Sequence, residues 1–453
     1  MSRAGLVYAG VDIGNTKIII TIGTFSNDND FRIIGSTVAP CDSEYFSNGC
    51  VLHIDEIAKS IKFGIKNLSH AYNVVVSDAF FGFSGHIDSR LSSIISDVSR
   101  REVIAKTDLD SLRNQALYGK REGREILDVI VTRYTLDDRV VRNPLGNTGY
   151  SLKADFIVVS GSAEQLKLLR KVAQKAGLKL HGFVLHQIAA AKTLVSNDAK
   201  EAGVVVVDLG ADITKVAVYF NNALVHVSNI VMGGNIVSND IKLLKQVPHK
   251  VAEKVKHDYG FAHVEAVKQD SLINIGDSLE GWGQKQFNLV GLTQIIQARL
   301  EMNFDMVANE ISKSNFYDAI GYGVVLTGGG AFMRNVAELF TLHTGLDARV
   351  GPPVKREFLG DSNVMSWPWL AVATGVLLEG IERPFILPEQ KEMWSEEAIN
   401  GDEKVSHKKT AKGKSVRPEK QKKAGNGLFK GLGATLASLF DDDSMETGKD
   451  TAI

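Results

Sequence analysis

The sequence has few of the residues that build small secreted domains or metal-bound domains. It contains only two cysteines among its 453 residues, Cys41 and Cys50. Two cysteines cannot form a disulfide framework, and without a histidine-rich segment they make no recognisable zinc site. We therefore expect a protein of a reducing compartment, and the cytoplasm fits best.

Long apolar runs and an excess of charge of one sign are also missing. No apolar run approaches the roughly 18 residues that are needed to span a bilayer. Asp12 interrupts the first apolar strand too early for a signal peptide. We therefore expect any membrane contact to be peripheral. The 52 basic and 53 acidic side chains nearly cancel, so the net charge gives no reason to invoke nucleic acid.

The chain does have the composition of a large globular protein, with 44% hydrophobic and 23% charged residues. At this length we expect two or more domains. Its most informative pattern is a strand, a turn and a second strand that occurs twice. In residues 203–219 (GVVVVDLGADITKVAVY), four valines lead to Asp208 and a turn, after which apolar residues alternate.

Residues 7–20 repeat this outline, with Asp12 and Gly14 at the same offset as Asp208 and Gly210. One such hairpin is weak evidence, because most are ordinary turns. Two copies predict an α/β fold whose duplicated halves flank a nucleotide cleft.

The two turns contain the groups that a nucleotide needs. Backbone N–H groups in a tight turn bind phosphate, and a small residue lets the phosphate approach closely. In the first turn Gly14, Asn15 and Thr16 offer amides, Thr16 a hydroxyl and Lys17 a charge. In the second turn, Gly210 and its neighbours as far as Thr214 would do the same.

Asp12 and Asp208 are the candidate metal-side carboxylates. We expect them to face each other across the cleft and to hold hydrated Mg²⁺, which usually keeps several waters. The alternative for either aspartate alone is a turn residue or a strand-end cap.

Two further segments and one dipeptide complete the candidate site. In LTGGGAFMR (326–334), three glycines between a strand and a helix suit a nucleoside or phosphate, or else form a loop that needs positive φ. In AEKVK (252–256), two polar groups on one helix face could reach ribose or adenine, or else form a solvated charged face. His186 and Gln187 could orient a catalytic water, although a satisfied histidine at a helix start is the alternative. The nucleotide-binding candidates in the two segments are Gly328, Gly329, Gly330, Met333, Glu253 and Lys256.

In this order, the Asp12 loop, the Asp208 loop, LTGGGAFM and AEKVK resemble the actin-like ATPase superfamily. Within it the chain resembles the FtsA family of bacterial cell-division proteins. More specific matches are residues 142–150 (RNPLGNTGY) with Leu152, residues 231–240 (VMGGNIVSND) and the C-terminal segment. The likeness covers nearly all of residues 6–440, and it adds Gly233 and Gly234 to the expected nucleotide contacts.

The resemblance implies an actin-like, ribonuclease H-like fold with a division into subdomains. Subdomain 1A would comprise residues 1–85 and 163–202, with 1C inserted at 86–162. Subdomain 2A would comprise 203–237 and 316–387, with 2B at 238–315. It further implies ATP and Mg²⁺ as cofactors, the division tubulin FtsZ as a partner of 2B, other division proteins as partners of 1C, and self-association into filaments.

One loop departs from the family pattern. Many relatives have a glycine-rich run that closes in threonine, whereas this chain has Gly210, Ala211, Asp212, Ile213 and Thr214. Asp212 can adopt a left-handed turn more readily than most residues, but its carboxylate would repel a γ-phosphate unless it faces Mg²⁺ or solvent. We expect ATP binding to persist and hydrolysis to be slow.

After residue 387 the composition changes. Residues 388–425 have no apolar periodicity and read as a disordered linker, with nine basic residues against one acidic residue between 404 and 423. Residues 426–440 then form an amphipathic pattern, followed by an acidic and polar tail at 441–453. The apolar side chains of residues 426–440 fall, on a helix, within an arc of about 120°: Leu428, Phe429, Leu432, Leu436, Leu439 and Phe440.

The pattern in 426–440 could pack on the protein's own core, enter a partner's groove or lie on a membrane. The basic approach favours an anionic lipid surface. With the resemblance, this predicts an ATP-binding tether that anchors FtsZ filaments to the cytoplasmic face of the membrane at the division site. The alternatives are a scaffold of another membrane machine, such as the pilus-assembly homologue PilM, and a small-molecule kinase of the same superfamily.

Overall fold

The computed structural model describes residues 6–25, 30–47, 49–117, 122–274, 286–351 and 370–382. All of them belong to one compact unit, residues 1–387. The predicted linker, amphipathic helix and acidic tail (388–453) lie outside the described residues.

The first sheet has five strands, in the order β11 (Lys179–Leu185), β6 (Val76–Phe83), β1 (Val7–Ile13), β2 (Lys17–Phe25) and β3 (Phe31–Pro40). β1, β2 and β3 form an antiparallel meander, whereas β6 is parallel to β1 and β11 is parallel to β6.

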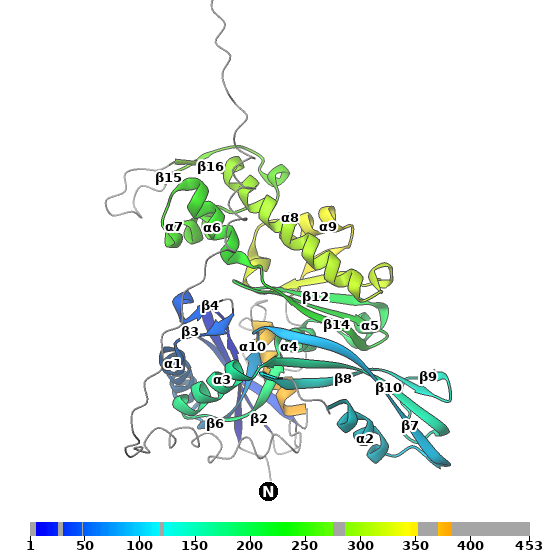
Figure 1. The fold of residues 1–453 in the computed structure, drawn as a ribbon. Coiled ribbons are helices and arrows are strands. Elements are labelled where there is room, and N and C mark those ends of the chain that lie inside the picture. Colours follow the sequence, from blue (N-terminus) through cyan, green and yellow to red (C-terminus); the bar gives the residue numbers. More distant parts are fainter. Residues whose placement is uncertain are drawn as a thin grey trace, which may run out of the picture. The chain divides into compact units, whose positions relative to one another are not determined.

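The second sheet, to which β12 and β14 belong in Figure 1, repeats this pattern strand for strand. Its order is β18 (Ala348–Val350), β17 (Val324–Thr327), β12 (Val204–Leu209), β13 (Thr214–Phe220) and β14 (Ala223–Ile230). β12, β13 and β14 are antiparallel, and β17 and β18 continue in parallel. The predicted duplication of the fold is therefore confirmed.

Helices cover both faces of the first sheet. The helices that pack on its strands include α1 (Ile54–Tyr72), α3 (Ala163–Ala176), α4 (His186–Leu194) and α10 (Ala371–Glu382). Ile19 packs on Leu370 and Ala373, whereas the neighbouring Ile20 lies beside Gly64 of α1. Since successive side chains of a strand point to opposite faces, α10 and α1 cover opposite faces of β2. Burial on both faces explains the unbroken apolar run at the start of β2.

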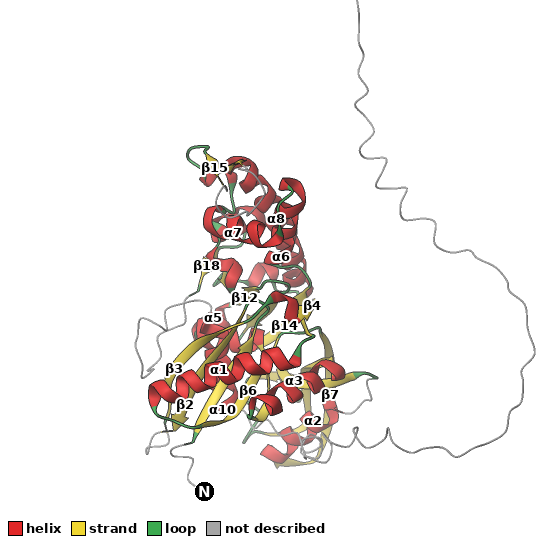
Figure 2. Ribbon diagram, turned by 90° about the vertical axis from the view of Figure 1, so that its left-hand side faces the viewer, coloured by secondary structure: helices red, strands yellow, loops and turns green. Residues whose placement is uncertain are grey.

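α1 and α3 lie side by side on one face (Figure 2). Ser162 caps α3, since its hydroxyl accepts a hydrogen bond from the Gln165 backbone N–H at 3.4 Å. The Gln165 side chain does not reach back to Ser162 to form a capping box. The Gln165 side chain instead accepts from the Val51 N–H at 2.9 Å, and so ties α3 to the small hairpin of β4 (Phe46–Ser47) and β5 (Cys50–Val51).

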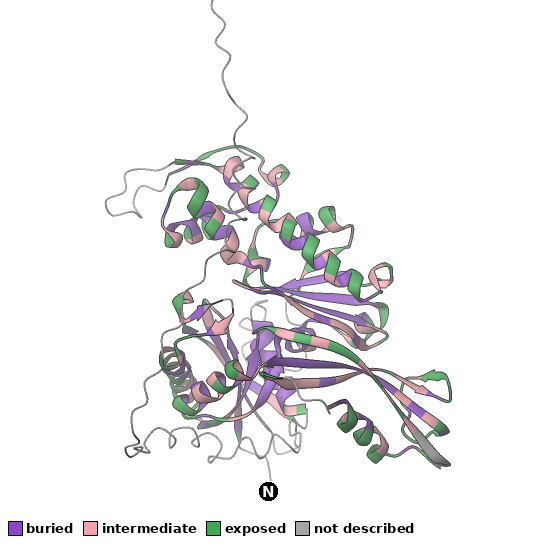
Figure 3. Ribbon diagram, in the orientation of Figure 1, coloured by how far each residue is buried: buried purple, intermediate pink, exposed green. Residues whose placement is uncertain are grey.

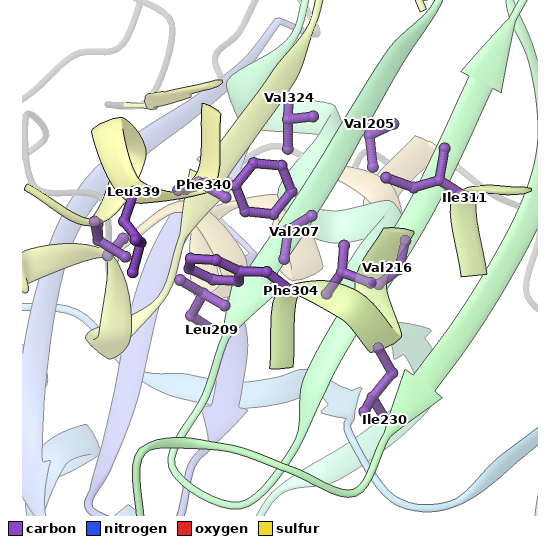
Figure 4. Close-up of a cluster of buried hydrophobic side chains, with 14 of the residues drawn as sticks. Val205, Val207, Leu209, Val216, Ile230, Phe304, Ile311, Val324, Leu339 and Phe340 are labelled. Atoms are coloured by element: carbon purple, nitrogen blue, oxygen red, sulfur yellow. The ribbon is translucent and has the colours of Figure 1, made fainter. Parts of the chain in front are cut away.

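The core of the second half lies between its sheet and two helices, α8 (Leu289–Lys313) and α9 (Val336–Thr344). The rings of Phe304 and Phe340 meet with centroids 4.8 Å apart over the valines of β12 (Figure 4). α8 is buried along one side and exposed along the other (Figure 3). The short α5 (Asn197–Ala202) precedes β12.

A separate antiparallel sheet is inserted between β6 and α3. Its order is β7 (Ile87–Val103), β10 (Thr148–Ser162), β8 (Arg124–Leu136) and β9 (Arg139–Val141). α2 (Lys106–Leu117) covers it, with Leu112 and Ala116 packed against Leu152 and Phe156. The structure thus contains a distinct element where the sequence predicted an insertion. The assignment of residue boundaries to subdomains stays a prediction.

A second small core follows β14. It joins α6 (Gly234–Lys245), α7 (His249–Tyr259), the start of α8 and the hairpin of β15 (Leu272–Asn274) and β16 (Gln286–Asn288). Arg299 of α8 makes a bidentate contact with Asp240 of α6, at 2.6 and 3.0 Å. This ion pair fixes α6, whose first turn borders the cavity described below.

Candidate functional site

Loops from both sheets line a cavity of about 800 Å³. This volume lies in the range of ligand pockets in proteins. All the residues predicted to bind a nucleotide line it: Asp12, Gly14, Asn15, Thr16, Lys17, Asp208, Gly210, Thr214, Gly233, Gly234, Glu253, Lys256, Gly328, Gly329, Gly330 and Met333. The fold therefore brings these segments together, although their role in binding stays a prediction.

The two turns at Asp12 and Asp208 have the same backbone closure. Gly14 N–H donates to the Lys17 carbonyl at 3.1 Å, and Gly210 N–H donates to the Ile213 carbonyl at 3.2 Å. These pairs lie at equal offsets from the two aspartates, so the loop shape is duplicated together with the sheets. Asp212 is not among the residues of positive φ. The second loop thus keeps its shape without the left-handed residue that the sequence suggested.

From the sequence we expected the Asp212 carboxylate to face Mg²⁺ or solvent, but the structure gives this side chain other partners. It accepts hydrogen bonds from the Asn15 amide of the first loop and from the Asn235 amide of α6, the latter at 2.6 Å. Its negative charge is therefore held by two amides, one from the loop of the first half and one from α6 of the second half.

Asp12 lies in the cavity wall opposite His186, with 3.3 Å between Oδ1 and Nε2. Burial raises the pKa of Asp12 to about 7, with Asp208 adding to the effect and Lys215 and Lys17 opposing it. Burial also lowers the pKa of His186 well below its usual value, so this imidazole is neutral at pH 7. The neutral ring of His186 therefore lies beside Asp12, but neither of the two atoms that face each other makes a hydrogen bond with the described residues.

Gln187 does not line the cavity. Its amide donates to the Ser228 carbonyl at 3.2 Å and to the Asn229 side chain, both on β14. The expected pair of water-orienting residues is therefore split, and only His186 borders the candidate site. Its role toward a water stays a prediction.

Sequence reasoning missed Lys215. This side chain lies opposite Asp208 on β13, with Nζ 2.7 Å from Oδ2, and the two side chains are 7% and 6% exposed. The signal available was period-2 alternation, which places Lys215 among the inward residues of a buried strand. A lysine there requires a carboxylate partner, since an unpaired buried ammonium is costly.

The residues present do not fit a resident Mg²⁺ ion. Such a site uses ionised carboxylates and waters around the metal. Here Asp208 already pairs with an ammonium, burial favours the protonated form of Asp12, and the Lys215 charge would repel a second cation. The expected Mg²⁺ site at Asp12 and Asp208 is thus not supported by the side chains as they stand.

The Thr214 hydroxyl is used within the protein. It donates to the Met232 carbonyl at 2.7 Å and accepts from the Asn303 amide at 3.0 Å. These bonds hold β13 against α8, so this hydroxyl is not directed at a ligand. Gly233 and Gly234 follow Met232, and Gly234 N–H donates to the Gly210 carbonyl at 3.0 Å.

The glycine run differs from its prediction in one respect. Gly329–Phe332 forms a 3₁₀ turn, and α9 begins only at Val336, so the glycines do not stand at an α-helix N-terminus. Gly328 has φ +85°, and a Cβ on it would overlap the Asp208 carboxylate. Only glycine lets this turn pack against the end of β12.

Glu253 and Lys256 form a partly buried hydrogen-bond network in the lining of the cavity. Lys256 Nζ donates to Glu253 at 2.7 Å, to the Ser238 hydroxyl at 2.8 Å and to the Gly234 carbonyl at 2.9 Å. Burial acts to raise the pKa of Glu253, but Lys256 and Ser238 outweigh it and hold that pKa below its usual value. The pair thus joins α7 to α6 and presents an ionised carboxylate.

The predicted membrane-binding residues Leu428, Phe429, Leu432, Leu436, Leu439 and Phe440 lie outside the described residues. In the part of the chain that the structure covers, no helix combines the length and apolar character needed to cross a membrane.

Comparison of the fold with solved structures finds a chain of a PilM-PilN type IV pilus biogenesis complex, with a TM-score of 0.61 and 16% identity. The match covers 84% of this chain and all of that one. At this identity the likeness concerns the fold alone, which is actin-like.

Sequence comparisons are more specific. The family description "Cell division protein FtsA" matches residues 205–375, and "SHS2 domain inserted in FTSA" matches residues 84–160. The cell division protein FtsA of Neisseria meningitidis serogroup B is 29% identical over 374 residues, covering 81% of this chain and 88% of that protein. That of Pseudomonas aeruginosa is 27% identical over 384 residues, covering 84% and 91%. The chain belongs to the FtsA family of cell-division proteins.

Proposed function

We propose that this protein binds ATP in the cavity and uses it as a structural switch in cell division. The observation that carries the proposal is the pair of identically closed loops, at Asp12 and at Asp208, on opposite sides of one cavity. Each loop offers backbone N–H groups to phosphate oxygens. Lys17 adds a positive charge on the first side.

The other end of the cavity suits the nucleoside. Glu253 is held ionised and can accept hydrogen bonds from ribose hydroxyls, with Lys256 beside it. The turn at Gly328–Gly330 presents bare backbone on which a flat base can lie. Titration with a fluorescent ATP analogue tests this assignment. Glu253→Gln should weaken binding, whereas Glu310→Gln, remote from the cavity lining, should not.

Hydrolysis is proposed to be slow. Fast phosphoryl transfer needs an activated water and stabilised charge at the γ-phosphate. Asp212 adds a negative charge in the second loop, and Gln187 is directed away from the cavity. Single-turnover assays should give rates far below the roughly 1–100 s⁻¹ of kinases, and turnover in that range would contradict the proposal.

We further propose that the protein polymerises and tethers FtsZ filaments to the cytoplasmic membrane. Support comes from the family, from the actin-like fold and from the amphipathic pattern at 426–440 behind its basic linker. In this proposal FtsZ binds the 2B region (238–315) and later division proteins bind the 1C region (86–162). The protein then lies at the division site, on the inner face of the membrane.

Liposome co-sedimentation tests the tether. The full chain should sediment with anionic vesicles, more so with ATP, and a chain ending at Gly425 should not. Phe429→Glu places a charge on the apolar side of the pattern, and Ala437→Glu places the same charge on the opposite side. The first substitution should abolish sedimentation and the second should leave most of it. If truncation changes nothing, the membrane proposal fails.

The competing function is a scaffold of another membrane machine, because the solved structure of similar fold belongs to a pilus-assembly complex. A pull-down with FtsZ separates the two, since only the division protein should retain it. A small-molecule kinase is less well supported, as it gives no reason for the segment 388–440.

A further inference from the structure

The two halves of the fold differ at one buried position beside the candidate phosphate site. Strand register pairs Asp12 with Ile19 in the first half and Asp208 with Lys215 in the second. Ile19 is buried and packs with Leu370 and Ala373. Because the first half builds the same hairpin with an apolar residue, the fold does not require a lysine at this position.

A buried ion pair is also not a general means of stabilising a fold. Its desolvation often offsets the Coulomb attraction, and well-packed apolar residues frequently serve as well or better. The Lys215–Asp208 pair is nearly completely buried, yet both side chains border the cavity. The presence of a charged lysine at this position is therefore better explained by a ligand that enters the cavity than by the stability of the fold.

The ammonium group is close to the second loop. A Cβ built on Gly210 would lie 3.5 Å from Lys215 Nζ. Among the described residues, Lys215 has one hydrogen-bond partner, Asp208. An ammonium group carries three donors, so two remain for oxygens that approach the loop. The influence of Lys215 also extends to Asp12, whose pKa it lowers against the effect of burial.

We propose that Lys215 is the built-in cation of this site and binds the polyphosphate of the nucleotide, in place of a divalent metal at Asp208. The inference rests on the proposed nucleotide binding and adds a residue and a metal requirement to it. It accounts for the poor fit of Mg²⁺ described above. It also predicts that nucleotide affinity depends little on Mg²⁺, because a fixed charge already faces the phosphates.

The experiment measures binding of a fluorescent ATP analogue to the full chain, with excess Mg²⁺ and with EDTA. We expect the wild-type dissociation constants in the two conditions to agree within about threefold. For Lys215→Met we expect at least about a tenfold loss in EDTA, equivalent to ~1.4 kcal/mol, and recovery on adding Mg²⁺, because Asp208 is then free to hold the hydrated ion. Lys192→Met removes a lysine paired with Glu382 outside the cavity, and should change neither value.

Lys215→Met leaves the Asp208 carboxylate unpaired, so the protein could lose stability. Asp208→Asn/Lys215→Met restores a neutral pair of similar volume. With folding checked by circular dichroism, it should bind ATP weakly in EDTA, and Mg²⁺ should not rescue it, because no carboxylate remains beside the loop.

Two failures are distinguishable. If wild-type protein binds no nucleotide in either condition, the proposed function itself fails. If it binds ATP only with Mg²⁺, and Lys215→Met binds equally well, nucleotide binding stands and the role of Lys215 is overturned.

Discussion

Single residues that pack against the end of β12 decide whether the two halves of the candidate site can form. Gly328 is the tightest of them, because its φ of +85° is strained for any side chain and a Cβ would overlap Asp208 and approach the Leu209 carbonyl to 2.7 Å. Gly329, the next residue, has open space around its Cα and no positive φ. We therefore expect a side chain at Gly328 to be destabilising and a side chain at Gly329 to be tolerated.

We predict that Gly328→Ala lowers the free energy of unfolding by about 1–3 kcal/mol and weakens ATP binding. Gly329→Ala should stay within about 0.5 kcal/mol of wild type. Urea denaturation of both variants checks this. Equal effects of the two substitutions would contradict the packing argument.

The raised pKa of Asp12 predicts that the stability of the folded protein falls as the pH rises. Its pKa is raised by burial from 3.8 to about 7 in the folded protein, so the folded state holds a proton that the unfolded chain releases near pH 4. The stability from this proton is complete below pH 4 and is lost as the pH rises to about 7.

Asp12→Asn removes that contribution. We predict that the variant gains stability relative to wild type between pH 5 and pH 8, by a total on the order of 3 kcal/mol. Urea denaturation at both pH values measures the difference. A difference that is constant with pH would show that the Asp12 pKa is not raised.

At the scale of elements, the first half depends on close contact between two helices. Gly375 of α10 faces the backbone of α4, and a Cβ there would overlap the Ala189 carbonyl. α10 also presses on β1 at Gly10, where a Cβ would lie 2.7 Å from the Leu377 side chain. α10 therefore packs closely on both the first sheet and α4.

We predict that Gly375→Ala destabilises the protein by about 1–3 kcal/mol, because neither backbone can move without disturbing the sheet. Gly291→Ala in α8 is the matched control, since its Cβ would meet atoms only at 3.6 Å or beyond. Alanine's higher helix propensity should make that variant neutral or more stable by up to about 1 kcal/mol. Thermal melts of the two variants measure these effects. If both substitutions shifted the melting temperature in the same direction, the argument from close packing of α10 would be refuted.

For the whole molecule, the proposed function couples assembly to membrane attachment. The amphipathic helix that we propose for 426–440 would be weak, because Gly431 and Gly433 each cost about 1 kcal/mol in propensity and Asp441–Asp443 follow it. Weak sites become effective when linked, since each later insertion is intramolecular. A filament would supply the linkage, with the basic linker as a leash.

We predict that the vesicle-bound fraction rises steeply at the concentration where filaments form, and that ATP shifts both transitions together. Binding should fall with added salt, because linker lysines attract anionic lipid by roughly 1 kcal/mol each. Co-sedimentation across protein and salt concentrations measures this. Monomers and filaments that bind vesicles equally would rule the coupling out.

Much of the architecture was predictable from local patterns. The run of valines before Asp208 and the repeated Asp and Gly offsets correspond to β12 and to two matching loops. These features depend on steric preferences and periodicity within a few residues. The helix expected directly after the glycine run was less predictable, because a 3₁₀ turn at Gly329–Phe332 separates the glycines from α9.

The sequence by itself thus determined the duplicated strand and loop pattern, the family and the loops that line the cavity, although it did not reveal Lys215. Only the tertiary structure decided their partners: Lys215 for Asp208, Asn15 and Asn235 for Asp212, and β14 for Gln187. The physical reason is that a strand or turn is specified by its neighbours along the chain. An ion pair or hydrogen bond across the fold depends on register and helix docking, which the whole core sets together.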